Sequence, residues 1–371
     1  MARPVKNSKL RLTKRKPPRA QTPKTGKLSK PVARWLQTPY RRLLILENAH
    51  FAIQICPEQG GALVSHVHKP SGIDIMWRNP YGQPPRLRLL DQPVASGSDL
   101  YDVMDGSWYV SLPNGFFPGS YFGAPLGTHG ELRALPWTVE KISRTADILR
   151  VTLRGASVRT PLVYVRELTV RRTSAQLGWK ETVQNRCDQD LPIAWLQHPT
   201  FGGDLIDGAR LVVPAKTVRI FNADHPEAMQ LKAGYSGAWP MVPERDTGKL
   251  RDCSVAPAKA SGVDHSVQLT DFSEGWGCIW NEARKLGFAL QWDLQKFPYA
   301  WSWANGGGGK HYPMWGAGHL MTLQPSTSPV GRFEDLQKNG SLLIIPAKGE
   351  VSTWMTTGFV TQSNGPWEGA S

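Results

Sequence analysis

Two histidines in similar surroundings are the first residues of this sequence that could carry out chemistry. His129 lies in the run Gly127–Trp137, where Glu131 and Arg133 add a carboxylate and a guanidinium. His198 follows a tryptophan and precedes a pair of glycines. A neutral imidazole can give or take a proton near pH 7, so two histidines in such loops suit acid/base chemistry. Each histidine alone could equally be a structural side chain.

An aromatic segment follows a strand with a polar face. In the predicted strand Phe288–Asp293, Gln291 and Asp293 share one face because side chains alternate along a strand. Trp301 and Trp303 share a face of the next segment. A sugar has an apolar C–H face and a polar hydroxyl rim, so indoles beside amides and carboxylates suit a sugar. The alternative is that these tryptophans fill the core.

Other chemical motifs are weaker, and none predicts a metal site. The glycine-rich run 305–310 lacks the spacing of a phosphate loop, and no helix-forming segment follows it. His66 and His68 point the same way on a predicted strand, but no third ligand is evident, so we expect them at the surface. The four cysteines are far apart and form no CxxC pair, which favours reduced thiols.

The elements that must position these residues are almost all strands. Alternating or β-branched runs are separated by many of the 36 glycines and 30 prolines, and segments with helical periodicity are almost absent. These features predict an all-β sandwich or barrel of antiparallel strands. The predicted strands are 43–47, 51–56, 62–67, 150–154, 162–172, 176–185, 278–281, 287–293, 341–346 and 351–359.

The chain divides by composition into a tail, one large domain and a short end. We predict a basic disordered tail over 1–36, a single carbohydrate-active β-sandwich domain over 37–362, and a frayed C-terminus over 363–371. Within the domain, 84–105 and 224–257 read as long surface or site-covering loops.

The net charge of +14 belongs to the tail. Residues 1–34 hold twelve Lys or Arg and no Asp or Glu, and the rest of the chain has 32 basic and 30 acidic residues. The tail could tether nucleic acid or an anionic surface, or be a solvated extension. We expect no nucleic-acid partner beyond this tail. No apolar signal core or membrane span is evident, which predicts a soluble cytoplasmic protein without a membrane partner.

Four motifs in order resemble the aldose 1-epimerase (galactose mutarotase-like) family. His129-Gly130-Glu131-Leu132-Arg133 with Pro136-Trp137 is similar to its first histidine motif, and His198-Pro199-Thr200-Phe201-Gly202 to its second. Phe297–Trp303 resembles a segment of bacterial members, and Leu323–Pro329, followed by Gly349-Glu350, resembles the C-terminal signature. The resemblance spans roughly 45–360.

This resemblance implies a β-supersandwich that binds a monosaccharide or short sugar and acts as an isomerase. Ring opening and reclosure would interconvert the α and β anomers of an aldose, without a metal or organic cofactor. By the resemblance His198 is the acid at the ring oxygen, and His129 binds and polarises the same region. Arg133, Glu131, Asp264, Gln291 and the two tryptophans, Trp301 and Trp303, are the expected sugar-binding residues.

One position departs from the family pattern. The family has a general-base glutamate where this chain has Gln324. An amide hydrogen-bonds but takes up no proton near neutral pH, and loss of a base costs about 10²–10⁴-fold in rate. Either another carboxylate substitutes, with Asp293 preferred over Glu131, or the protein is a catalytically silent carbohydrate-binding or sensing protein.

Overall fold

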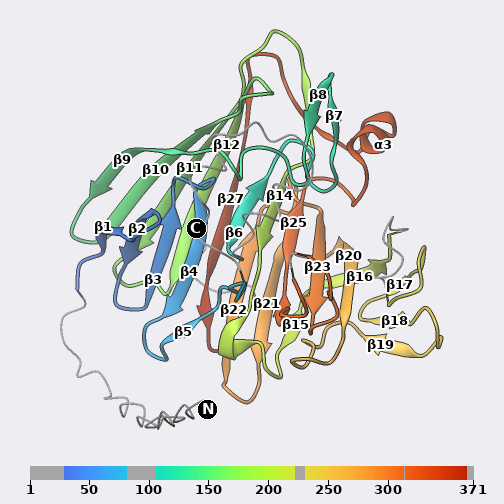
Figure 1. The fold of residues 1–371 in the computed structure, drawn as a ribbon. Coiled ribbons are helices and arrows are strands. Elements are labelled where there is room, and N and C mark those ends of the chain that lie inside the picture. Colours follow the sequence, from blue (N-terminus) through green and yellow to red (C-terminus); the bar gives the residue numbers. More distant parts are fainter. Residues whose placement is uncertain (1–28, 82–105, 222–229, 313, 366–371) are drawn as a thin grey trace, which may run out of the picture.

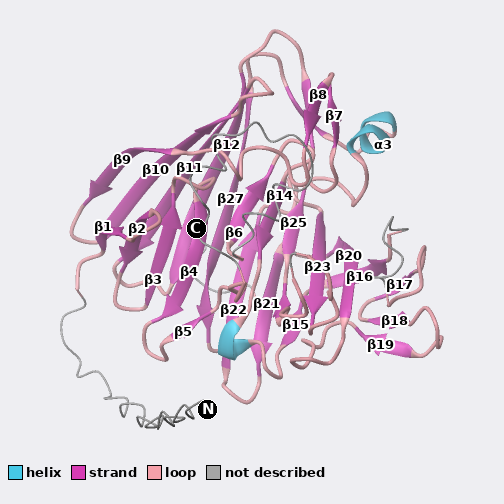
Figure 2. Cartoon of the chain, viewed as in Figure 1, coloured by secondary structure: helices cyan, strands magenta, loops and turns pink. Residues whose placement is uncertain are grey.

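Two large antiparallel sheets form the body of the molecule (Figures 1 and 2). The computed structural model describes residues 29–81, 106–221, 230–312 and 314–365. The strands predicted from alternation are confirmed, most to within two residues at either end. The all-β class and the supersandwich architecture are therefore confirmed.

The larger sheet has 13 strands. Its main path, in spatial order, is β1 (Val32–Gln37), β2 (Arg42–Glu47), β3 (Phe51–Cys56), β4 (Ala62–His68), β6 (Trp108–Ser111), β14 (Leu196–Pro199), β25 (Gln324–Ser326), β23 (Tyr299–Asn305), β20 (Asp264–Phe272), β16 (Ala215–Arg219) and β17 (Ser236–Ala238). Two short strands join at the side, β5 (Ile73–Asp74) on β4 and β24 (Leu320–Met321) on β23.

The second sheet has eight strands and packs against the first. In spatial order they are β15 (Arg210–Val212), β21 (Trp276–Asn281), β22 (Leu286–Trp292), β27 (Glu350–Val360), β12 (Gln176–Asn185), β11 (Leu162–Arg171), β10 (Ile148–Ala156) and β9 (Thr138–Arg144).

Small elements decorate this sandwich. Three two-stranded sheets pair β7 (Gly119–Tyr121) with β8 (Ala124–Leu126), β13 (Leu191–Ile193) with β26 (Leu343–Ile345), and β18 (Met241–Pro243) with β19 (Leu250–Asp252). The helical elements are the 3₁₀ turn η1 (Gly203–Leu205) and helix α3 (Phe333–Lys338). Neither is long and apolar enough to cross a membrane, and no other helix lies in the described part of the chain.

The main core lies between the two sheets. Trp108 of β6 stacks on Trp179 of β12 with ring centroids 4.8 Å apart. Burial of such apolar surface is the main favourable contribution to folding, about 25 cal/mol per Å² removed from water.

Two sequence-based expectations about segments need correction. The tail boundary was placed too late, because β1 begins at Val32 and pairs along its whole length with β2. Residues 224–257 were expected to be irregular, but β17, β18 and β19 lie in this range. Most of the predicted tail and the whole first long loop lie outside the described residues, as do parts of the second loop and of the C-terminus: 1–28, 84–105, 224–229 and 366–371.

The expectation of surface histidines on β4 is wrong for His66. This side chain is completely buried between the sheets, with Phe288 and Phe359 in edge contact with its ring. The register of the β3–β4 pair shifts between Gln54 and Ile55, with Val64 of β4 as the extra residue, and simple alternation cannot anticipate this bulge.

Candidate functional site

Four neighbouring strands of the large sheet bring one row of side chains together. Tyr109 of β6 is the cross-strand partner of His198 of β14. Leu196 pairs with Ser326 of β25, and continuing this antiparallel register by two residues places Gln324 opposite His198. Trp301 of β23 is in turn the partner of Gln324. The row thus joins segments far apart in the sequence.

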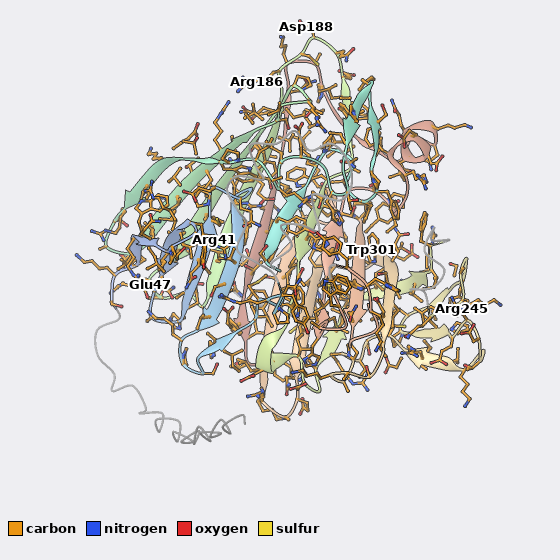
Figure 3. The ribbon with its side chains drawn as sticks, in the orientation of Figure 1. Arg41, Glu47, Arg186, Asp188, Arg245 and Trp301 are labelled. Atoms are coloured by element: carbon orange, nitrogen blue, oxygen red, sulfur yellow. The ribbon has the colours of Figure 1, made fainter. Side chains whose placement is uncertain are left out.

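This row lies on the outer face of the large sheet. Trp108 and Gln197, which alternate with Tyr109 and His198, point into the space between the sheets. Trp108 stacks on the second sheet, and Gln197 Nε2 donates to Glu181 of β12. Because neighbouring side chains on a strand point to opposite faces, Tyr109 and His198 face away from the core. Figure 3 marks Trp301 on the same sheet.

His198 is held by stacking and is kept neutral. Its ring lies flat on Tyr109, with centroids 4.5 Å apart and an interplanar angle of 13°. Only 5% of its surface is exposed, and Nδ1 has no hydrogen-bond partner among the described residues. Burial, with smaller contributions from His129 and Arg133, holds the pKa of His198 well below its usual range.

The loop that carries His129 brings the second imidazole against the first. The two rings meet edge to face with centroids 4.7 Å apart. His129 has a φ of +63° and Gly130 one of +72°, so the chain turns sharply at this point. Two elements far apart in the sequence therefore meet at the site, and the prediction that these two histidines share a site agrees with this geometry.

The hydrogen bond of His129 fixes its tautomer. Nδ1 lies 2.6 Å from the carbonyl oxygen of Gly115. A carbonyl can only accept, so Nδ1 carries the proton and Nε2 of the neutral ring keeps its lone pair. Burial lowers the pKa of His129 to about 3, although the Gly115 carbonyl opposes this shift. His129 is therefore a neutral hydrogen-bond acceptor at pH 7.

The two charged residues of the first histidine motif have different surroundings. Arg133 lies by the site, with Cζ 5.9 Å from the centre of the Tyr109 ring and Nε donating to the Thr128 carbonyl. Glu131 does not line the site. Its carboxylate accepts bonds from the backbone of the 158–159 turn and from a threonine hydroxyl, so its lone pairs are already used. The expected sugar-binding role of Glu131 is thus corrected to a structural one.

Gln324 occupies the position beside His198. Its Nε2 donates to the Thr322 hydroxyl at 2.8 Å, while Oε1 is buried without a donor among the described residues. A buried acceptor without a partner is unfavourable by about 1–3 kcal/mol, and a ligand hydroxyl would satisfy it. On the β25 side of His198, the row therefore offers an amide with one free acceptor.

Asp264 and Trp303 lie on the same outer face, farther along the sheet. Trp303 Nε1 donates to the Asp264 carboxylate at 2.8 Å. Burial raises the pKa of Asp264 to about 6, against the opposing effect of the Trp303 bond. Asp264 is on β20, three strands from His198, and strands are about 4.8 Å apart. Its carboxylate is therefore too distant to act on the same sugar atoms as His198.

Asp293 and Gln291 lie on the opposite side of the molecule, which overturns their expected place. Both line a hollow on the outer face of the eight-stranded sheet. Trp292, between them, is buried in the core between the sheets. The prediction that Gln291 and Asp293 share a polar face is confirmed. Alternation could not predict to which of the two sheets this strand belongs. Asp293 thus does not face His198 and does not replace the missing base.

Sequence reasoning missed Tyr109 and Gly115. Neither carries a catalytic motif, and their roles depend on the pairing of β6 with β14 and on the path of the histidine loop. Within the described residues, no group of three or more His, Cys, Asp or Glu side chains is placed to hold a metal ion. The site thus offers two neutral imidazoles, an amide, an indole and a guanidinium, a set that hydrogen-bonds neutral hydroxyl groups.

A family model matches most of this sequence. A family model described as "Domain of unknown function (DUF4432)" matches residues 41–358. No curated protein matches the sequence.

Solved structures of similar fold include galactose mutarotase-like proteins. The one from Clostridium acetobutylicum has a TM-score of 0.63 at 13% identity, over 89% of this chain and 99% of that one. A similar protein from Lactobacillus casei has a TM-score of 0.56 at 15% identity, over 86% and 100%. The Slr1438 protein from Synechocystis has a TM-score of 0.60 at 16% identity, over 92% and 100%.

Proposed function

The chain belongs to the family described as Domain of unknown function (DUF4432), and we propose that it binds an aldose at the His129–His198 site and slowly interconverts its anomers. The observation that carries this proposal is the row Tyr109, His198, Gln324 and Trp301, with His129 packed edge-on against His198. The galactose mutarotase-like names of two structures of similar fold support it.

The chemistry of the row fits a neutral sugar. The partly exposed indole of Trp301 offers a surface for the C–H face of a pyranose, and Gln324 Oε1 and His129 Nε2 accept hydrogen bonds from its hydroxyls. Both imidazoles of the cluster are neutral, and Arg133 is its one fixed charge. Most groups of the cluster are therefore neutral hydrogen-bond partners, which suit the hydroxyls of an uncharged sugar.

The tautomer of His129 gives the two histidines distinct roles. His129 Nε2 accepts the proton of the C1 hydroxyl, while a ring N–H of His198 donates to the ring oxygen, and the bond between C1 and that oxygen breaks. The product is the open-chain aldehyde with a hydroxyl at the former ring oxygen. After rotation about the C1–C2 bond, the reverse transfers close the ring as the other anomer and restore both imidazoles.

This reaction should be slow. A histidine whose pKa lies near 3 is a weak base, and a neutral imidazole is a weak acid, so both transfers have an unfavourable driving force. A glutamate at position 324 would provide a stronger base beside His198. We therefore expect a rate about 10²–10⁴-fold below that of a site with this carboxylate.

A catalytically silent sugar-binding or sensing protein is the second candidate. Gln324 favours it, because an amide with a free acceptor suits binding better than proton transfer. The two candidates share the ligand and the site, and differ only in turnover.

Polarimetry tests both candidates. The optical rotation of freshly dissolved glucose, galactose and other aldoses is followed with wild type, His198→Ala and Gln324→Glu. A wild-type rate above buffer that His198→Ala abolishes supports the slow epimerase. A wild-type rate equal to that of His198→Ala and of buffer rejects it.

The Gln324→Glu variant separates the remaining outcomes. A gain of about 10² or more over wild type supports the missing base as the cause of slow turnover. If wild type is inactive, sugar binding measured by calorimetry and lost in His198→Ala supports the silent binder. An active wild type whose rate the variant leaves unchanged means that the base lies elsewhere.

A further inference from the structure

The outer face of the eight-stranded sheet carries a second constellation, remote from the histidines. Two indoles, Trp276 of β21 and Trp354 of β27, flank Gln291 of β22 and Asp293, the residue that follows this strand. Gln291 is the cross-strand partner of Trp276, and the Asp293 N–H donates to the Trp354 carbonyl. All four residues line one hollow of about 570 Å³.

The polar groups between the indoles offer acceptors to a ligand. Gln291 is only 6% exposed, yet its Oε1 has no hydrogen-bond partner among the described residues. Asp293 Oδ1 accepts from the Gln295 N–H, which leaves the lone pairs of the second carboxylate oxygen for a ligand. A buried amide oxygen without a donor is unfavourable, and a ligand bearing hydroxyl groups would supply that donor.

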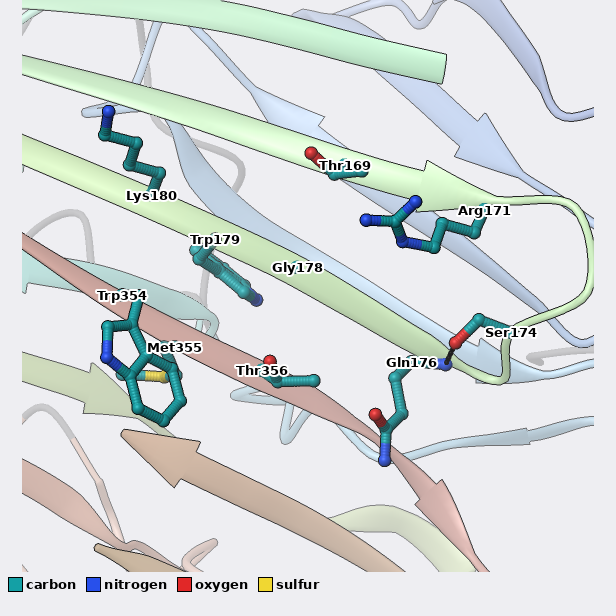
Figure 4. A pocket seen from close by; sticks show the side chains of 10 residues that line it. All are labelled: Thr169, Arg171, Ser174, Gln176, Gly178, Trp179, Lys180, Trp354, Met355 and Thr356. Atoms are coloured by element: carbon teal, nitrogen blue, oxygen red, sulfur yellow. Dashed lines mark hydrogen bonds between the residues drawn. The ribbon is translucent and has the colours of Figure 1, made fainter. Parts of the chain in front are cut away.

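The hollow continues across β27 into a second one. Trp354, 44% exposed, lines both. The second hollow, about 470 Å³, is lined from β11, β12 and β27, and Gly178 leaves no side chain between Thr169 and Thr356 (Figure 4). Both volumes fall in the range of roughly 300–1,000 Å³ typical of ligand sites.

Both donors and acceptors line this second hollow. Arg171 and Lys180 contribute cationic donors, and Gln176 adds an amide whose Oε1 is buried without a hydrogen-bond partner among the described residues (Figure 4). A carboxylate at one end, cationic donors at the other, an amide in each hollow and an exposed indole between them match an extended chain of sugar rings, since each ring offers both hydroxyl donors and acceptors around an apolar face. A cationic ligand would fit the carboxylate end but would meet Arg171 and Lys180 at the other.

We propose that this outer face is a second saccharide-binding site, for a neutral oligosaccharide or polysaccharide that lies across Trp354. Trp354 stacks on a ring of the sugar, and Gln291 with Asp293 accepts its hydroxyl protons. The site lies on the opposite side of the sandwich from His198, so its occupation is independent of the proposed anomer chemistry. Both indoles and both acceptors act as binding groups and take part in no bond change.

Affinity electrophoresis through gels that contain glycogen, dextran, galactomannan, xyloglucan or laminarin tests this proposal. Wild type is expected to be retarded by at least one of them. Trp354→Ala and Gln291→Leu should each weaken that interaction tenfold or more. Trp35→Ala is the matched control, because Trp35 is 43% exposed on β1 of the other sheet, and it should leave retardation unchanged. Circular dichroism and thermal unfolding verify that each variant is folded.

The histidine site provides the second control. His198→Ala should keep full retardation, and Trp354→Ala should keep the wild-type polarimetric rate, so failure of either proposal is recognised separately. The second site is rejected if none of the five polysaccharides retards the wild type, or if Trp354→Ala is retarded equally. It is also rejected if tetramethylammonium alone, and no saccharide, quenches tryptophan fluorescence in a manner that depends on Trp354.

Discussion

His66 is an ionisable side chain in an apolar environment. Both ring nitrogens are buried without a hydrogen-bond partner among the described residues, and three phenylalanine rings, Phe51, Phe288 and Phe359, have centroids 4.9–5.6 Å from its own. Burial lowers the pKa of His66 to about 3, with a small further contribution from His68. The folded protein thus contains His66 as neutral imidazole over most of the accessible pH range.

This burial predicts a loss of stability in mild acid. Between about pH 6.5 and pH 3 the unfolded chain protonates His66 and the folded protein does not, so the free energy of unfolding decreases as the pH falls through this window. Each pH unit inside it costs up to about 1.4 kcal/mol. His66→Leu removes this contribution and an unsatisfied polar ring, so urea unfolding at pH 7 and pH 4.5 should show a smaller decrease for the variant. An equal decrease in both proteins would contradict the assignment.

At the scale of one element, the loop Gly127–Arg133 depends on a backbone that only glycine tolerates at position 130. Gly130 has a φ of +72°, and a Cβ there would lie 1.9 Å from the Leu112 carbonyl oxygen. Glu131 fastens the other side of the loop to residues 158–160. His129 directly precedes both anchors, and its own N–H donates to the Phe116 carbonyl, so this loop holds the imidazole in an ordered position.

Gly130→Ala should therefore displace His129 as well as destabilise the fold. We expect a decrease of about 2–4 kcal/mol in the free energy of unfolding, from the strained φ and the backbone clash together. Gly72→Ala is the matched control, with a φ of +74° and open space around its Cβ, so it isolates the cost of the φ angle. Denaturant unfolding of both variants gives the difference. If the two lose equal stability, the Leu112 contact is not a constraint.

The strands were predictable because alternation encodes burial, as in β10, where Leu149, Val151 and Leu153 are buried. What alternation does not encode is the sheet to which a strand belongs. Asp293 is preferred as the substitute base from its place beside the aromatic segment in the sequence, but the strand that it follows, β22, lies in the other sheet. The predicted sugar-binding role of Glu131 was wrong for another reason: its partners at 158–160 come from a turn whose position depends on the tertiary fold. The histidine pair was found because both motifs are local in sequence.

For the whole molecule, one buried network joins the two sheets directly behind the histidine site. Arg166 of β11 donates from Nε to Glu181 of β12 at 2.7 Å, and from Nη1 to the carbonyl of Gly61, which directly precedes β4 of the large sheet. Glu181 also accepts from Gln197, which in turn accepts from Trp108 Nε1. Since Gln197 precedes His198, this network fixes the strand that carries the site.

Removing one partner of the Arg166–Glu181 ion pair should lower the stability of the fold strongly, because the other charge stays buried without its partner. Arg166 and Glu181 are almost completely buried, so Glu181→Gln or Arg166→Met leaves a charge without its partner, at a cost of about 3–5 kcal/mol. Arg166→Met combined with Glu181→Met removes both charges and should lose less stability than the sum of the two single methionine changes. Chemical unfolding of Arg166→Met, Glu181→Met and the double variant, as a double-mutant cycle with wild type, measures this coupling.

A second ion pair in the same sheet provides the comparison. Arg150 and Glu167 lie 3.9 Å apart with both side chains largely exposed, so the same cycle there should give less than about 1 kcal/mol. Equal coupling at the two pairs would mean that burial is not what makes the inner pair important. Because the network holds β14, Glu181→Gln should also weaken sugar binding at His198, whereas Arg150→Met should leave it unchanged. Calorimetric titration at 15 °C, on protein confirmed as folded, separates this positional effect from simple loss of stability.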